Sequence, residues 1–186
     1  MMENPRERGD SLPARQQFEE AFLPHLDAAY NLARWLLRND QDAEDCVQDA
    51  YLRAYKAFPR FRGGDGKAWL MTIVRNVCYT AIRKLRRHET PESFDENIHQ
   101  ATDDTATTEE FRQKANAETL RRGLERLPPE FREMIVLHDL EGHSYKEIAA
   151  IVAVPIGTVM SRLARAREKL RVEIIAISTK EISYEL

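Results

Sequence analysis

The chain has 186 residues, of which 42% are hydrophobic and 32% are charged, and its formal net charge is −3 at pH 7. That length suits one ordinary domain or two small ones. The sequence has no apolar run of ~20 residues, which argues against a membrane span, and its polar start "MMENPRERGD" argues against a signal peptide. Cys46 and Cys78 are too few for a disulfide framework or a cysteine-rich zinc site, so we expect no metal, no cofactor and a reduced, cytoplasmic setting.

The first predicted unit, residues 12–88, is expected to be helical throughout. Apolar residues recur every three or four positions over 18–36, which predicts a helix with one buried face. Asp40 or Asp42 can cap a second helix, which ends at Pro59. The acidic side chains of this second helix lie opposite its apolar stripe, on a face that is only solvated in most proteins.

A glycine-rich loop, "RGGDGK", leads to a third long helix from about Ala68 to Arg87. Trp69 lies on its apolar stripe, so we expect Trp69 to pack in the core rather than stack on a base. The other face carries cations, an amide and a tyrosine, the groups that bind the phosphates and extruded bases of a single strand. These candidate side chains are Lys67, Arg75, Asn76, Tyr79, Arg83, Arg86 and Arg87.

The segment 89–112 is acidic and polar and has no sustained apolar period, which predicts a flexible linker. Residues 1–11 and 176–186 are predicted to be tails, and the second has no assigned role. Because neither strand alternation nor hairpin turns are present in the sequence, the expected fold class is all-α, with two small helical domains joined by the linker.

The second predicted unit, residues 113–175, is a series of helices. The first helix runs to the proline pair 128–129, and Gly142 is suited to end the next one as a C-cap. Ser144 and Glu147 then form the S-x-x-E pattern of a capping box.

Two short helices with a tight turn follow this capping box. The first runs from Tyr145 to about Ala153, and Pro155 suits the first position of the second. Apolar residues from Ile156 to Leu170 are spaced by 3, 4, 3 and 4, which gives the second helix one docking face and one exposed face. This pattern is typical of a helix-turn-helix, although a generic helical hairpin is the alternative. The exposed side carries groups that can bind base edges and phosphates: Thr158, Ser161, Arg162 and Arg165.

Charge is segregated along the chain. Residues 60–87 contain eight bases and one acid, and residues 143–171 contain six bases and two acids. Residues 40–49 and 89–110 contain acids and no base. Solvated helix faces usually interleave the two signs, whereas separate basic blocks indicate two surfaces that face nucleic acid.

The stretch "LPPEFREMIVLHDLEGHSYKEIAAIVAVPIGTVMSRLARAREKLR" resembles the carboxy-terminal domain of the extracytoplasmic-function (ECF) sigma factors, the small alternative initiation subunits of bacterial RNA polymerase. The resemblance implies that residues 113–175 are sigma region 4, which contacts the β flap and binds the −35 promoter element with the helix that begins near Pro155. Met160 stands where many members carry Lys or Arg, and Ala164 is small, so the −35 sequence that is read stays open.

The pattern "DAEDxxQDxxLRA" resembles the segment by which these sigma factors bind the β′ clamp helices of core polymerase. It implies that residues 12–88 are sigma region 2. The "WLxxIVRN" run resembles the helix that binds the −10 element, where Asn76 matches the family's asparagine and Thr80 stands where many members have Asp. The residues implied in core binding are Asp45, Gln48, Asp49 and Leu52.

The function implied by the resemblance is that of an ECF-type sigma factor, which binds core RNA polymerase, directs it to promoters and assists melting. An anti-sigma factor is implied as a further partner. A stand-alone operator-binding regulator is the alternative, and it would bind duplex DNA without polymerase. We expect no catalytic residue, because no nucleophile–base signature, phosphate-cradling motif or metal-ligand spacing is found in the sequence.

Overall fold

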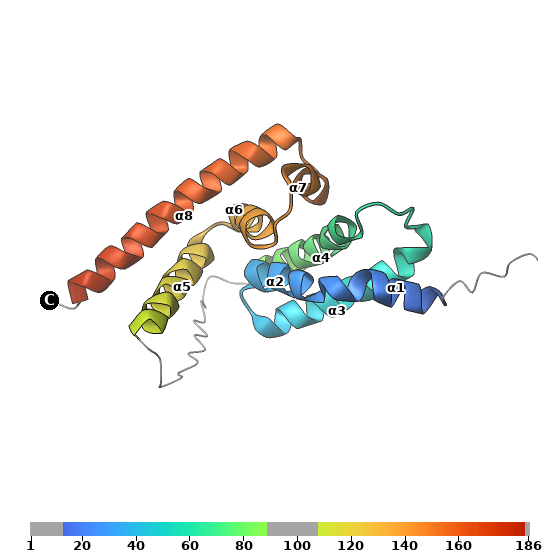
Figure 1. Cartoon of the computed structure of the whole chain (residues 1–186), viewed down its shortest axis with the longest axis horizontal. Coiled ribbons are helices and arrows are strands. Elements are labelled where there is room, and N and C mark those ends of the chain that lie inside the picture. Colours follow the sequence, from blue (N-terminus) through green and yellow to red (C-terminus); the bar gives the residue numbers. More distant parts are fainter. Residues whose placement is uncertain (1–12, 89–107, 185–186) are drawn as a thin grey trace, which may run out of the picture.

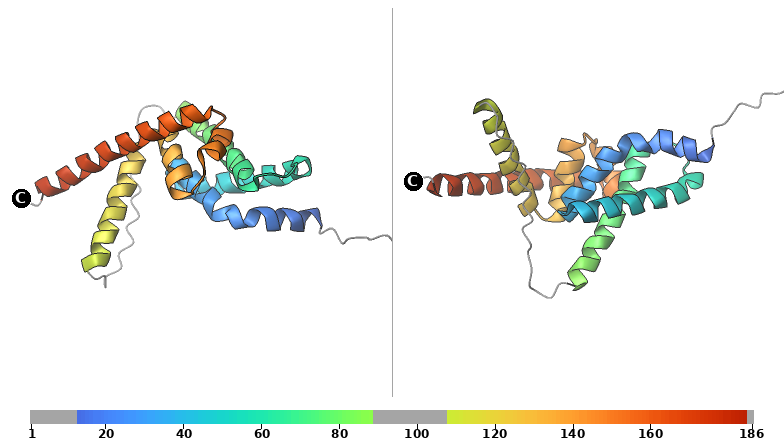
Figure 2. Two further views of the ribbon diagram at one scale, coloured as in Figure 1. Left: turned by 45° about the horizontal axis from the view of Figure 1, so that its top comes forward. Right: turned by 90° about the horizontal axis from the view of Figure 1, so that it is seen from below.

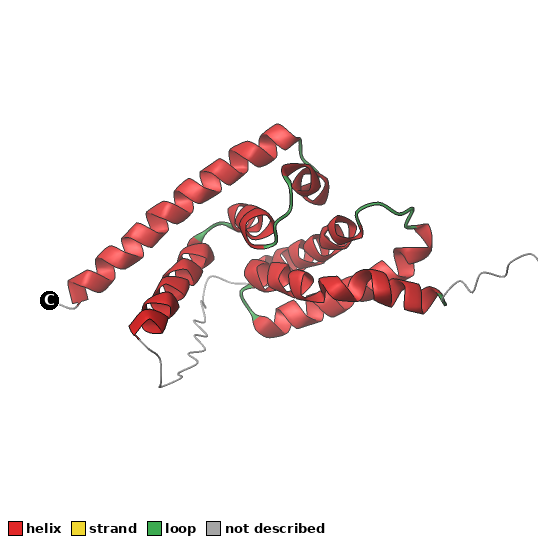
Figure 3. Ribbon diagram, in the orientation of Figure 1, coloured by secondary structure: helices red, strands yellow, loops and turns green. Residues whose placement is uncertain are grey.

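The structure is a computed structural model that describes residues 13–88 and 108–184, and within these ranges it contains helices and loops but no strand (Figure 3). The all-α prediction is therefore confirmed for the described residues. The predicted tail 1–11 and most of the predicted linker 89–112 lie outside them.

The N-terminal half, residues 13–88, consists of four helices joined by short turns (Figure 1). Their apolar faces enclose an aromatic cluster in which Phe22 packs against Phe61 and Trp69, with ring centroids 5.7 and 5.2 Å away. Trp69 is thus part of the core, as predicted. The helices are α1 (Ala14–Phe22), α2 (Leu26–Leu37), α3 (Asp40–Ala57) and α4 (Gly66–His88), with 3₁₀ turns at Leu23–His25 and Phe58–Arg60.

Asn39, rather than Asp40 or Asp42, caps α3. Its side chain accepts a hydrogen bond of 2.9 Å from the backbone N–H of Asp42. Asparagine is as good an N-cap as aspartate. The two aspartates instead lie in the first turn, where their charge is favourable to the helix dipole.

The C-terminal half, residues 108–184, contains a second set of helices whose far ends project away from the first half (Figure 2). The set comprises α5 (Thr108–Arg126), α6 (Pro129–Ile135) with a π-helical turn at Val136–Leu140, α7 (Tyr145–Val152) and α8 (Ile156–Tyr184). Two predicted boundaries differ from these bounds. Helix α5 begins inside the segment predicted as a linker, and α8 continues through most of the tail predicted at 176–186.

Packing against α5 explains why α8 continues. Ile177 is fully buried, and the spacing from Leu170 through Ile174 to Ile177 prolongs the apolar stripe of the helix. The two helices approach closely at Gly123, where a β-carbon would lie 3.1 Å from both Leu170 Cδ1 and Ile174 Cγ1.

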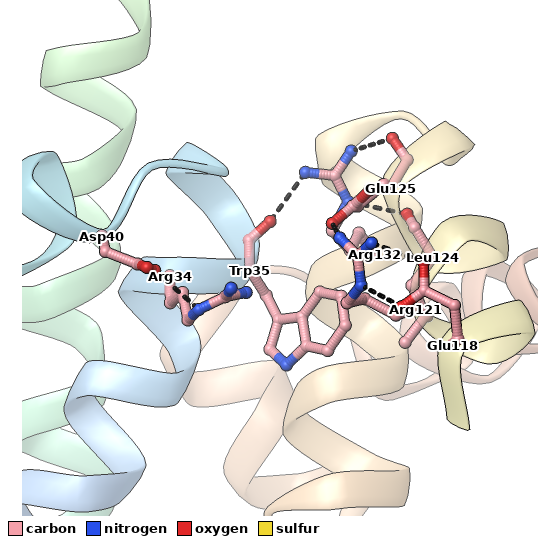
Figure 4. Close-up of polar contacts among 8 residues, drawn as sticks. All are labelled: Arg34, Trp35, Asp40, Glu118, Arg121, Leu124, Glu125 and Arg132. Carbon is pink, nitrogen blue, oxygen red and sulfur yellow. Dashed lines mark hydrogen bonds and ion pairs between the residues drawn. The ribbon is translucent and has the colours of Figure 1, made fainter. Parts of the chain in front are cut away.

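The two halves pack against each other through α2 with α6 and α4 with α7. Arg132 of α6 is 3% exposed, and its guanidinium donates hydrogen bonds to the carbonyls of Leu124 (2.8 Å) and Glu125 (2.8 Å) and, across the interface, to that of Trp35 (2.6 Å) (Figure 4). It also donates to the carbonyl of Leu127 at 2.7 Å. Burial lowers the pKa of Arg132 to about 10, but the side chain still carries its charge at neutral pH. One arginine therefore satisfies the last carbonyls of α5 and ties them to the end of α2.

Among the described residues, no single helix is long and apolar enough to cross a membrane. Only α7 and α8 taken together reach the required length and composition, and they are bent by 99°.

Candidate nucleic-acid interface

The outer face of α3 carries the four residues predicted to bind polymerase. Asp45 and Gln48 are exposed, and Leu52 is a large apolar side chain with 55% of its surface accessible. Asp49 is half-buried and forms a bidentate pair with Arg53, with distances of 3.0 and 2.8 Å. The structure thus brings the four residues onto one face of α3, with Leu52 as its exposed apolar side chain.

The residues of α4 predicted to bind DNA fall into two groups. Asn76, Arg83 and Arg87 are exposed, whereas three others are half-buried because the C-terminal half covers them. The side chain of Arg86 lies outside the described residues. The covered residues are Lys67, Arg75 and Tyr79.

Arg75 forms an ion pair across the interface between the two halves. Its guanidinium donates to both carboxylate oxygens of Glu133 in α6, at 2.8 and 3.2 Å, and lies 4.5 Å from the centre of the Tyr79 ring. The Glu133 side chain is fully buried and that of Arg75 is 19% exposed. Burial raises the pKa of Glu133, and the charge of Arg75 opposes that rise. Glu133 is thus paired with Arg75, which the sequence predicts to bind DNA.

Lys67 is held in the same way at the start of α4. Its ammonium donates to the backbone carbonyl of Glu141 at 3.0 Å and lies 4.0 Å from the carboxylate of that residue. The Glu141 carboxylate also accepts a hydrogen bond from Asn31 of α2, at 3.1 Å. Two anionic residues of the C-terminal half therefore cover two predicted −10 contacts.

Sequence reasoning missed Arg132, Glu133 and Glu141, the residues that carry these interface contacts. A signal was present, since Arg132 and Glu133 are charged residues inside the apolar run around Met134 and Ile135. Charged side chains in such a run are buried only when they are paired.

Helices α7 and α8 form the predicted helix-turn-helix. Ser144 and Glu147 make the predicted capping box, with hydrogen bonds of 3.3 and 2.6 Å between each side chain and the backbone N–H of the other residue. Ala153 ends α7 in the left-handed conformation, with φ of 55°. Pro155 precedes the first helical residue of α8 rather than occupying it, and its carbonyl accepts from Thr158 and Val159. The 99° bend between the helices lies in the range of helix-turn-helix motifs.

Replacing Ser144 with alanine is expected to lower the free energy of unfolding by about 1 kcal/mol, because the first turn of α7 loses its cap. The Ser144 hydroxyl is the main cause that lowers the pKa of Glu147, to about 2. Since this value is below the ordinary value of glutamate, the stabilisation is complete above about pH 4. It is lost as the pH falls toward about 2. Urea unfolding as a function of pH measures both effects, and Ser144→Thr, which keeps a capping hydroxyl, is the control.

The faces of α8 agree in part with the prediction. Val159, Leu163, Ala166 and Leu170 are buried as expected, whereas Ile156 is 47% exposed. Of the predicted DNA-binding residues, Ser161 and Arg165 are exposed, and Thr158 and Arg162 lie half-buried at the edges of the exposed face. The exposed face also contains Gly157, Met160 and Ala164.

Other charged residues of α8 have intramolecular partners. Arg167 holds Asp139 of the π-helical turn with a bidentate pair, at 3.1 and 2.5 Å, and Arg171 pairs with Glu168 at 3.1 and 2.7 Å. Arg167 thus fixes α8 on its own half, while Arg165 points to solvent.

Cys46 and Cys78 are both buried between α3 and α4. Hydrogen bonding to Cys78 lowers the pKa of Cys46, and hydrogen bonding to Cys46, together with burial, raises the pKa of Cys78. Across residues 13–88 and 108–184, no group of three or more His, Cys, Asp or Glu side chains is placed to hold a metal ion.

Two family models match the chain. "Sigma-70 region 2" matches residues 21–88, and "Sigma-70, region 4" matches residues 117–170. The first match covers α2 to α4, and the second covers most of α5, all of α6 and α7, and α8 as far as Leu170.

Similar proteins of known name cover most of the chain. The ECF RNA polymerase sigma factor SigE of Mycolicibacterium smegmatis is 34% identical over 161 residues, which are 85% of this chain and 62% of SigE, less than two thirds of that relative. SigM of Mycobacterium tuberculosis is 36% identical over 157 residues, 84% of this chain and 76% of SigM.

Two solved structures share the fold. The sigma factor RpoE in complex with the anti-sigma factor NepR from Bartonella quintana has a TM-score of 0.71 and 31% identity, and the match covers 86% of this chain and 97% of that one. CnrH in complex with the cytosolic domain of CnrY has a TM-score of 0.60 and 26% identity, with 87% and 90% covered.

Proposed function

The chain belongs to the ECF sigma factors of the sigma-70 family, and on that premise we propose that it binds core RNA polymerase and directs it to promoters through −10 and −35 recognition. In this proposal residues 12–88 act as region 2 and residues 113–175 as region 4. Their working place is the cytoplasm, where polymerase and template are found.

The observation that carries the proposal is the presence of two unlike surfaces in one chain. The face of α3 that leads to Leu52 carries Asp45 and Asp49 and ends in this exposed apolar side chain, which suits a protein partner rather than DNA. The face around Arg165 on α8 is cationic and projects from a helix-turn-helix, which suits the major groove. A stand-alone operator-binding regulator needs only the second of these.

Transcription with purified components tests the proposal. Core polymerase supplemented with the chain should start RNA at fixed positions on a promoter library, whereas core alone should not. If the chain instead shifts duplex DNA tightly without core, the operator-binding alternative is favoured.

The proposed −10 contacts of α4 require the two halves to separate. Arg75 and Lys67 cannot bind DNA phosphates while Glu133 and Glu141 hold them. Asn76, Arg83 and Arg87 are exposed in the present arrangement and are proposed to make the first contacts. We propose that an anti-sigma factor, the class of partner that RpoE binds in its solved complex, competes with DNA for the same residues.

Arg165→Ala is expected to reduce −35-dependent transcription by about 1–3 kcal/mol of promoter discrimination without lowering stability, because this exposed guanidinium is proposed to bind a base edge. Arg167→Ala on the same helix is the matched control, since Arg167 is bound to Asp139. It should change stability slightly and leave promoter preference unchanged. Run-off transcription from promoters with intact and scrambled −35 elements measures both variants, and an unchanged preference in Arg165→Ala would remove Arg165 from the interface.

A further inference from the structure

Part of the exposed face of α8 is apolar and small rather than polar or charged. Met160 is 53% exposed, and it lies between Gly157 and Ala164, both exposed on the same stripe one turn away on either side. A β-carbon at Gly157 would meet nothing within 4 Å, so the surface there is open. The exposed face of the proposed −35 helix therefore presents a thioether and a methyl group beside its polar side chains.

The polar groups near this patch are partly used within the chain. The Ser161 hydroxyl donates to the Thr158 carbonyl at 3.1 Å, which leaves its oxygen as an acceptor. Arg162 is half-buried, and its charge acts on the buried Glu133 of α6, which places it toward the inner side of the helix. Arg165 is the exposed cation at the edge of the patch.

Apolar side chains discriminate among bases in the major groove because they cannot form hydrogen bonds with the polar base edges. Covering the polar edge of guanine, cytosine or adenine with a thioether or a methyl group leaves donors or acceptors without partners, which is unfavourable. Thymine presents a methyl group at the same place, and apolar side chains pack against it. Met160 and Ala164 are separated by about 6 Å along the helix, which is close to two steps of about 3.4 Å between stacked bases.

We propose that Met160 and Ala164 read the methyl groups of thymines at one or two neighbouring positions of the −35 element, beside the base or phosphate bound by Arg165. This inference rests on the proposed function of α8 as the −35 helix. It identifies the preferred −35 element as one with thymine opposite the second and third turns of α8, and it makes Met160 a specificity-determining residue.

The experiment uses the complete chain bound to core polymerase. A duplex library with a randomised −35 element is selected for binding to this holoenzyme, and each thymine of the selected element is then replaced singly by deoxyuridine, which lacks only the methyl group. We expect binding to weaken about fourfold at one or two neighbouring positions, which corresponds to the ~0.8 kcal/mol contributed by one buried methyl group.

Variants of Met160 link the effect to the side chain. In Met160→Ala the deoxyuridine effect at one of these positions should disappear, whereas Met160→Leu should retain it. Met160→Lys should select guanine there, because lysine binds the O6 and N7 atoms of guanine. Val172→Ala, at a 52% exposed apolar residue further along α8, is the matched control and should leave the selected element unchanged.

The outcomes separate this inference from the proposed function. If binding depends on the −35 sequence but no deoxyuridine substitution weakens it, methyl reading by α8 is wrong and the −35 assignment stands. If scrambling the −35 element leaves holoenzyme binding and selection unchanged, both are wrong. Methyl dependence that persists in Met160→Ala at every position would also overturn the role of Met160.

Discussion

Leu52→Asp is expected to abolish binding of the chain to core RNA polymerase without unfolding it. Leu52 is 55% exposed on α3, so its side chain contributes little to the core of the free chain. Loss of a hot-spot side chain costs about 2–4 kcal/mol, so if Leu52 is such an anchor the affinity should fall by a factor of about 30 to 1,000. Fluorescence anisotropy with labelled chain and purified core measures the loss.

The control for Leu52→Asp is Val172→Asp, which places the same charge at a 52% exposed apolar residue of α8. That variant should bind core as the original chain does. Asp49→Arg is also expected to prevent core binding, but it breaks the Asp49–Arg53 pair as well, so Leu52 gives the cleaner result. Undiminished core affinity of Leu52→Asp would show that α3 is not the docking helix.

Arg75→Met is expected to open the chain at neutral pH. The substitution leaves the fully buried Glu133 carboxylate without its cation, and removing one partner of a buried pair costs about 3–5 kcal/mol. Separation of the two halves returns the carboxylate to water and avoids that cost. Small-angle scattering should therefore report a larger radius of gyration for Arg75→Met than for the unaltered chain.

Two further measurements identify the cause of this opening. Arg75→Met combined with Glu133→Leu should restore the compact form, because an apolar pair needs no cation. Lowering the pH should also restore it in the single variant. Burial raises the pKa of Glu133 above that of a solvated glutamate, so the compact form binds the proton more tightly and is favoured as the pH falls. Arg83→Met, on the exposed face of α4, should stay compact, and a compact Arg75→Met would mean that this pair does not hold the halves together.

Helical periodicity predicted most of the fold. The inward stripes of α3, with Ala43, Val47 and Ala50, and of α8, with Val159 and Leu163, were all recoverable from the sequence, because a residue buried within its own helical unit recurs with the helix repeat. The cap of α3 was predicted one or three residues too late, at Asp40 or Asp42, because Asn39 and both aspartates are good caps and only geometry chooses Asn39.

The candidate site was predicted less completely, because periodicity identifies the side of a helix that faces away from its own core but not what covers that side. Arg75 and Lys67 lie on the side of α4 that faces away from the core of its own half. Glu133 and Glu141, more than fifty residues later in the chain, nevertheless accept hydrogen bonds from them. On α8 the same reasoning separated docking and exposed faces, but it favoured the arginines and did not identify Met160 as an exposed apolar residue of that face.

The close packing of α5 on α8 at Gly123 implies that the orientation of the turns proposed to bind DNA is set from a distance. Helix α8 is continuous from Ile156 to Tyr184. A small change in its tilt where Leu170 and Ile174 pack against Gly123 therefore displaces Met160 and Arg165 near its other end. A larger side chain at position 123 would therefore be expected to change which base pairs the proposed DNA-binding residues reach, without any substitution in those residues.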